Sequence, residues 1–169
     1  MVEIDQNFET TARAAARGLV AAMAMTGTRV VSTSAGLIEE TPPGAIVGQQ
    51  AHGLVSGLSD DQRALVTELA HWAYGAVGGA AFGLLAPTLR GHPWAGPVYG
   101  LAVWLAFELG LAPLLGVEYE RGRAIVPRAV IALDHVLYGV VVAGRLAPEP
   151  TVAHPGWFPR WARKLLARA

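Results

Sequence analysis

The chain has 169 residues, a formal net charge of zero and no cysteine; 53% of its residues are hydrophobic and 15% are charged. The balanced net charge argues against binding of nucleic acid, which requires a basic face, and the lack of cysteine excludes disulfides and thiolate metal sites. Because so apolar a composition is unusual for a water-soluble domain of this size, it favours an integral membrane protein with the lipid bilayer as its first partner.

Four apolar segments are long enough to cross a bilayer, since a helical span needs about 20 residues. They cover residues 15–36, 69–88, 94–116 and 125–144. The first and the fourth are weaker because Arg29 interrupts one and Asp134 and His135 interrupt the other. The sequence therefore predicts an all-α protein in which residues 1–150 form a four-helix transmembrane bundle.

The second helix is expected to begin outside the membrane. Ser59 precedes Asp60, Asp61 and Gln62, and this order is typical of a helix start, with a serine N-cap and glutamine at the capping-box position. The two later connections are short, so neighbouring helices should be antiparallel. Arg and Lys residues are more numerous on the side of the termini, which places both termini in the cytoplasm.

The segment 151–169 differs from the rest by being basic and amphipathic. Trp157, Trp161 and Leu165 are spaced by four residues, and so are Arg160, Lys164 and Arg168. We expect a cytoplasmic helix that lies on the anionic membrane surface through Trp157, Arg160, Trp161, Arg163, Lys164 and Arg168. The alternative is a solvated tail that makes no membrane contact.

Polar residues recur within the predicted spans. The phrase His-x-x-Tyr-Gly occurs at residues 71–75 and again at 135–139, and Arg29, Glu108 and Asp134 lie at similar predicted depth. Ionisable groups in hydrocarbon are costly and commonly mark a functional site. The predicted site that binds a small polar ligand, ion or proton comprises Arg29, His71, Tyr74, Glu108, Asp134, His135 and Tyr138. In this interpretation Arg29 is the counter-ion of Glu108 and Asp134.

Two other interpretations remain open. The polar residues could form a hydrogen-bonded network that only sets helix packing, as in a structural or accessory subunit of a membrane complex. Alternatively, Glu68, His71, Glu108 and His135 could bind a metal, or the two histidines a haem. No cofactor is predicted, and nothing resembles an arrangement of nucleophile and base, so an enzyme is not expected.

Small residues follow one another at intervals of four on the same helices. Gly75, Gly79 and Gly83 share one face of the second span, while Gly100 and Gly139 lie on the third and the fourth. Such stripes permit close helix packing, either within the chain or in a homo-oligomer. The doubled histidine phrase, together with Gly18-Leu19 and Gly100-Leu101, suggests two parallel helical-hairpin repeats.

The order of these motifs resembles the YagU-like family of small bacterial inner-membrane proteins. The residues that carry the resemblance are His71, Trp72, Tyr74, Gly75, Gly79, Gly83, Tyr99, Gly100, Val103, Trp104, Glu108, Pro113, Gly116, His135, Tyr138 and Gly139. The resemblance covers residues 17–145 and implies a multi-pass, four-helix protein of the bacterial cytoplasmic membrane. It implies no activity, substrate or catalytic residue.

Overall fold

The structure is a computed structural model, and it describes residues 2–37, 44, 46–47, 52–116 and 125–145. All regular structure in these residues is helical. The segment 151–169, with its expected membrane-surface helix, lies outside the described residues.

The longest helix, α1, runs from Val2 to Ser34. At a rise of 1.5 Å per residue its 33 residues measure about 50 Å, which exceeds the hydrocarbon thickness of a bilayer. The helix therefore begins 13 residues before the predicted first span, residues 15–36. The additional turns carry Glu9 and Arg13, which form an exposed ion pair one turn apart.

The predicted start of the second helix is confirmed. Helix α4 runs from Asp60 to Gly83, and Ser59 and Gln62 form the full reciprocal capping box. A short helix, α3 (His52–Val55), precedes it. Arg63 donates from Nε to the carbonyls of Val55 and Leu58, which fixes the turn between α3 and α4.

The expected end of this span at residue 88 was wrong. Helix α4 ends at Gly83, and a separate short helix, α5, covers Pro87–Arg90. Ala86 has the extended conformation (φ −55°, ψ 140°) that a following proline favours, so the chain cannot continue as one helix into Pro87.

The third predicted span is a composite helix. It comprises α6 (Ala95–Ala106), a π-helical turn η1 (Phe107–Leu111) and α7 (Ala112–Leu114). Pro113 has no N–H to donate to Leu109 four residues earlier, and the Ala112 N–H bonds five residues back to Phe107. The wider turn changes the direction of the side chains around it, an effect that the residue spacing did not predict.

The last described helix is α8, from Ile125 to Val142, and it packs antiparallel on α6 through glycine. A Cβ at Gly100 would collide with the His135 carbonyl, and one at Gly96 would lie 2.6 Å from the Gly139 carbonyl oxygen. Gly139 in turn faces the Gly96 backbone, so two helix backbones are in direct contact here.

Helices α1 and α4 make the equivalent contact on the other side of the molecule. Gly75 and Gly79 face Gly18, and Gly83 faces Thr11, so the face of α4 with these glycines is covered by α1 of the same chain. This stripe is therefore not free for a second copy of the protein, contrary to the homo-oligomer alternative.

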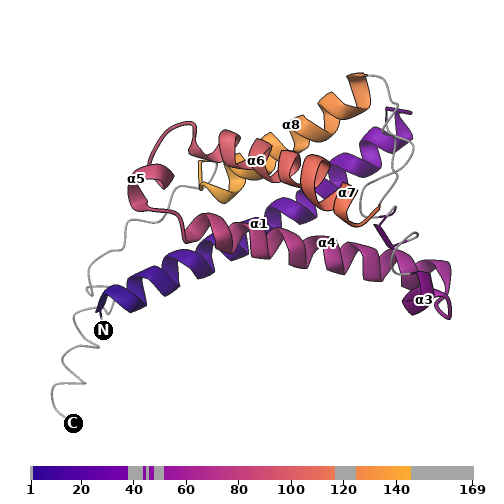
Figure 1. Ribbon diagram of the computed structural model, residues 1–169, viewed down its shortest axis with the longest axis horizontal. Helices are drawn as coiled ribbons and strands as arrows, with labels where there is room; N and C mark the ends of the chain where they lie inside the picture. Colours follow the sequence, from indigo (N-terminus) through magenta and orange to yellow (C-terminus); the bar gives the residue numbers. More distant parts are fainter. Residues whose placement is uncertain (1, 38–43, 45, 48–51, 117–124, 146–169) are drawn as a thin grey trace, which may run out of the picture.

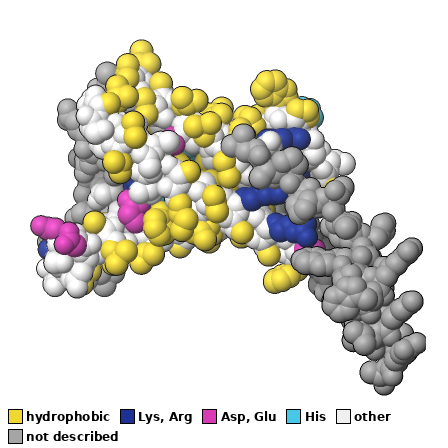
Figure 2. Space-filling model, turned by 180° about the vertical axis from the view of Figure 1, so that it is seen from behind, with side chains coloured by type: hydrophobic (Ala, Val, Ile, Leu, Met, Phe, Trp, Pro, Cys, Tyr) yellow, Lys and Arg dark blue, Asp and Glu magenta, His cyan; other side chains and the backbone are white. Residues whose placement is uncertain are grey.

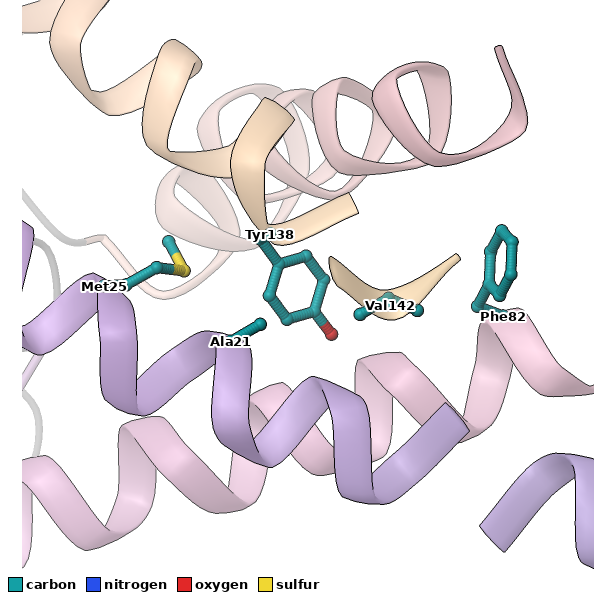
Figure 3. Close-up of a cluster of buried hydrophobic side chains, with 5 residues drawn as sticks. All are labelled: Ala21, Met25, Phe82, Tyr138 and Val142. Carbon is teal, nitrogen blue, oxygen red and sulfur yellow. The ribbon is translucent and has the colours of Figure 1, made fainter. Parts of the chain in front are cut away.

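The two helix pairs cross one another (Figure 1). Pair α1–α4 forms one layer and pair α6–α8 the other, with α8 packed on α1. Between them lies a small apolar core at the crossing of α1, α4 and α8 (Figure 3). Its buried members are Ala21, Met25, Phe82, Tyr138 and Val142. Phe82 also meets the ring of Tyr99 edge-on, with centroids 5.1 Å apart.

Apolar side chains are exposed in many places on the face of the molecule that Figure 2 shows. The side chains of Val31, Val77, Val98 and Leu114, for example, are between 61% and 83% exposed. Exposed apolar surface of this kind is typical of a face that contacts a membrane or another protein.

Two described helical segments are long and apolar enough to cross a membrane, Ala95–Leu114 and Ile125–Val142. Helices α1 and α4 do not meet the same criterion. Their sequences contain many glycine, serine and threonine residues, together with Arg29 in α1 and Glu68 and His71 in α4, and these lower the mean hydropathy.

Candidate functional site

A cavity of about 360 Å³ lies where the two helix pairs meet. Its walls are mostly apolar, with Met25, Val103, Trp104, Phe107 and Leu111 among the lining residues. Six of the seven residues predicted for the ligand site also line it. They are Arg29, His71, Tyr74, Asp134, His135 and Tyr138. Residues far apart in the sequence thus converge on one space between α1, α4, α6 and α8.

Arg29 is neutralised by Glu68 on the neighbouring helix α4. Its Nη2 lies 3.0 Å from Glu68 Oε2, and the two side chains are only 13% and 28% exposed. Thr26 joins this pair, because its hydroxyl donates to the same carboxylate oxygen at 2.6 Å and accepts from Arg29 at 3.0 Å. Trp72 Nε1 donates to the Thr26 hydroxyl at 3.1 Å. The expectation that Arg29 would neutralise Glu108 or Asp134 was therefore wrong.

His71 lies beside this ion pair. Its Nδ1 is 3.4 Å from Arg29 Nη2. A guanidinium can only donate hydrogen bonds, so this arrangement requires an unprotonated Nδ1 on His71. A neutral His71 then carries its proton on Nε2.

His135 has the opposite arrangement. Its Nδ1 lies 2.9 Å from the carbonyl oxygen of Ile131, which can only accept, so Nδ1 carries the proton. A neutral His135 therefore has its lone pair on Nε2. Every buried side-chain nitrogen or oxygen among the described residues has a partner. Neither Nε2 is bonded to a described residue, so both are accessible.

Asp134 forms no ion pair with a described residue. Its Oδ1 accepts a hydrogen bond of 2.7 Å from the Thr28 hydroxyl, which links α8 to α1. Thr28 and Asp134 both line the cavity. The carboxylate therefore stands at the cavity wall with a neutral hydrogen-bond donor and without the counter-ion that Arg29 was expected to supply.

The two tyrosines of the repeated phrase differ in their surroundings. Tyr138 is 4% exposed and donates from its hydroxyl to the Gly75 carbonyl at 2.7 Å, and its ring lies in the apolar core (Figure 3). Tyr74 is 47% exposed and has no hydrogen bond to a described residue. Tyr99, which was not predicted, donates to the Gly78 carbonyl at 2.5 Å. Tyr138 and Tyr99 thus attach α8 and α6 to α4.

Glu108 does not belong to the cavity, which corrects the prediction. It lies in the π-helical turn, and its Oε1 is 2.8 Å from Nη2 of Arg128 on α8. Phe107 and Leu111 on either side of it line the cavity instead. The prediction placed Glu108 on the same helix face as Gly100 and Trp104 because the three residues are four apart. That spacing indicates one face only in a regular α-helix, and the π turn departs from the regular helix.

The alternative metal set is not assembled. Glu68 is bonded to Arg29, Glu108 is bonded to Arg128, and in the part of the chain that the structure describes no three His, Asp or Glu residues form a group that could hold a metal ion. Both histidines line the cavity. The Nδ1 atom of His71 faces a hydrogen-bond donor, Arg29, whereas the Nδ1 atom of His135 faces an acceptor, the Ile131 carbonyl.

The prediction did not include Thr28, which lines the cavity, or Thr26 and Trp72, which bond at the Arg29–Glu68 pair. Thr26 lies on the small-residue face that continues from Gly18 through Ala22, a pattern visible in the sequence. Thr28 carries no such signal, since only the crossing of α1 and α8 brings it to Asp134.

Comparison with known proteins gives no further guide to these residues: no family model, curated protein or solved structure matches the chain.

Proposed function

We propose that the protein is a multi-pass membrane protein that binds a small ligand, ion or proton in the cavity between its two helix pairs. The observation that carries the proposal is the convergence of Arg29, His71, Asp134 and His135 from three helices on a cavity with mostly apolar walls. A mostly apolar pocket with a few convergent polar groups is the usual form of a small-molecule site.

The proposed topology has four spans with both termini in the cytoplasm, in a bacterial inner membrane as the resemblance to YagU-like proteins implies. Exposed apolar side chains on α1 and α4, such as Val31 and Val77, support spans in addition to the two most apolar segments. Arginines also gather at one end of the bundle, where Arg17 contacts Gly144 and Arg145 bonds to the carbonyls of Gly91 and His92. Basic residues are retained on the cytoplasmic side.

The second candidate function is a structural or accessory subunit whose polar residues only fix packing. It is favoured by the hydrogen bonds that join Thr26, Arg29 and Glu68 across α1 and α4. The charges of Arg29 and Glu68 match each other in this group, so its charge balance needs no ligand. The accessible imidazole nitrogens and Asp134 are what distinguish the binding proposal from this one.

The binding proposal is tested by filling the cavity. Ala70 lines the cavity, and it is exposed rather than packed into the core. Ala70→Phe therefore places a ring in the cavity without displacing core atoms. Ala73 is also exposed on the same helix but lies outside the cavity, so Ala73→Phe is the matched control. The probe is 4-fluorobenzyl alcohol, followed by ¹⁹F NMR with the full chain in phosphatidylcholine nanodiscs.

We expect saturable binding to the wild type and to Ala73→Phe, and at least about tenfold weaker binding to Ala70→Phe because the probe and the new ring compete for one volume. Binding that is equal in the two variants, or absent from the wild type, would contradict the proposal and leave the packing function as the better account.

A further inference from the structure

We infer that the cavity selects an amphiphilic amine in its ammonium form, with the cationic head at Asp134 and the apolar body against the aromatic wall. This inference rests on the proposed binding function and adds the charge and the chemical class of the ligand.

The first argument is the charge balance at the cavity. Arg29 is the only lysine or arginine among the described residues that line it, and its charge is already matched by Glu68 at 3.0 Å. Among the described residues, the one hydrogen-bond partner of the Asp134 carboxylate is the Thr28 hydroxyl, and it forms no ion pair with them. With both histidines neutral, the three formal charges of Arg29, Glu68 and Asp134 sum to −1, so a ligand with one positive charge completes the site.

The second argument concerns hydrogen-bonding character. Asp134 Oδ2 can only accept when the carboxylate is ionised, and His135 offers a second acceptor at Nε2 because Nδ1 donates to Ile131. The two acceptors come from adjacent residues of one helix. An ammonium group, which carries several N–H donors, matches both of these acceptors, whereas a carboxylate ligand could bond only to donors elsewhere in the lining, such as His71 Nε2–H.

The third argument is the composition of the rest of the wall. Trp104, Phe107, Tyr74 and Tyr138 all line the cavity, together with aliphatic side chains. Aromatic rings attract cations through their negative faces and also bury apolar groups. A ligand with a hydrocarbon or aryl body beside its ammonium group matches both properties, while a hydrated inorganic cation matches only the first.

The test compares three probes that share one ring and differ in the charge of the head group. They are 4-fluorobenzylamine (cationic at neutral pH), 4-fluorobenzyl alcohol (neutral) and 4-fluorobenzoate (anionic). Binding to the full chain is followed by ¹⁹F NMR in phosphatidylcholine nanodiscs, whose zwitterionic lipids add no net charge. We expect the amine to bind about 10- to 100-fold more tightly than the alcohol, the range for a hydrogen bond to a charged group, and the benzoate to bind weakest.

The variant Asp134→Asn preserves the shape of the side chain and can still accept from Thr28. We expect it to abolish the preference for the amine, so that the amine no longer binds more tightly than the alcohol. The control is Asp61→Asn, which removes an exposed carboxylate at the start of α4 and should change neither probe.

The outcomes separate the inference from the proposed function. If none of the three probes binds the wild type saturably, the binding function itself fails. If the probes bind with equal affinity, or if benzoate binds best, the cavity binds ligands but the cationic assignment is overturned. The ranking on the wild type needs no variant, so it decides the question even if Asp134→Asn does not fold.

Discussion

At the scale of single residues, the two copies of His-x-x-Tyr-Gly have the same letters and different environments. Arg29 lies beside His71 but the Ile131 carbonyl lies beside His135, which assigns the ring protons to different nitrogens. Both tyrosines line the cavity, but Tyr138 is buried and bonded, whereas Tyr74 is half exposed and has no hydrogen bond to a described residue. The tyrosine of the second copy therefore joins two helices, and the tyrosine of the first copy does not.

This difference gives a prediction with an internal control. Tyr138→Phe removes the hydrogen bond to the Gly75 carbonyl and should lower the free energy of unfolding by about 1 kcal/mol. Tyr74→Phe removes a hydroxyl with no described partner and should change the free energy of unfolding by less than about 0.5 kcal/mol. Denaturation of both variants in detergent micelles measures the two values. Equal losses would show that Tyr138 does not hold α8 to α4 in this way.

At the scale of helices, glycine determines which elements pair. Gly18 faces Gly75 and Gly79, and Gly96 faces Gly139 and Ala143. In the register set by the histidine phrases, Gly18 therefore corresponds to Gly96, not to Gly100 as the sequence suggested. The internal duplication stays a prediction. The packing contacts give it a register that differs by one helical turn from the one that the sequence suggested.

Gly79→Ala tests the close approach of α1 and α4. The new Cβ would collide with the Ala14 carbonyl, a backbone atom that cannot rotate away, so we expect a loss of about 1 to 3 kcal/mol in the free energy of unfolding. Gly27→Ala is the matched control, because Gly27 also lies within a helix and nothing is within 4 Å of its added Cβ. It should gain about 0.5 to 1 kcal/mol. Thermal unfolding in micelles compares the two, and a stable Gly79→Ala protein would mean that the helices are farther apart.

At the scale of the whole molecule, the number of spans is the property on which the function depends. If α1 and α4 cross the membrane together with the two apolar segments, Ser56 and His92 lie on opposite sides. If only the two apolar segments cross, both residues lie on the same side. The two arrangements therefore differ in one measurable property of two loop positions.

The absence of cysteine makes this measurement direct. In Ser56→Cys and His92→Cys single variants, we expect a membrane-impermeant maleimide to label Ser56→Cys from outside intact cells and His92→Cys only after the membrane is opened. Labelling of both positions from the same side would overturn the four-span proposal. Gly27→Cys, near the middle of the proposed first span (residues 15–36), serves as the control for a position that lipid should protect.

The sequence by itself determined the helical class, the capping box that begins α4, and six residues that line the cavity. These features depend on local hydrogen bonding and on the exclusion of polar groups from hydrocarbon, which a residue pattern records. Only the tertiary structure decided the ion pairs. Arg29 could have met Glu68, Glu108 or Asp134, and Pro113 with its π turn directs Glu108 to Arg128 while Thr28 takes Asp134. Which residues pair depends on where helices that are distant in the chain cross one another. A shift of one helix by a single turn would bring different side chains together.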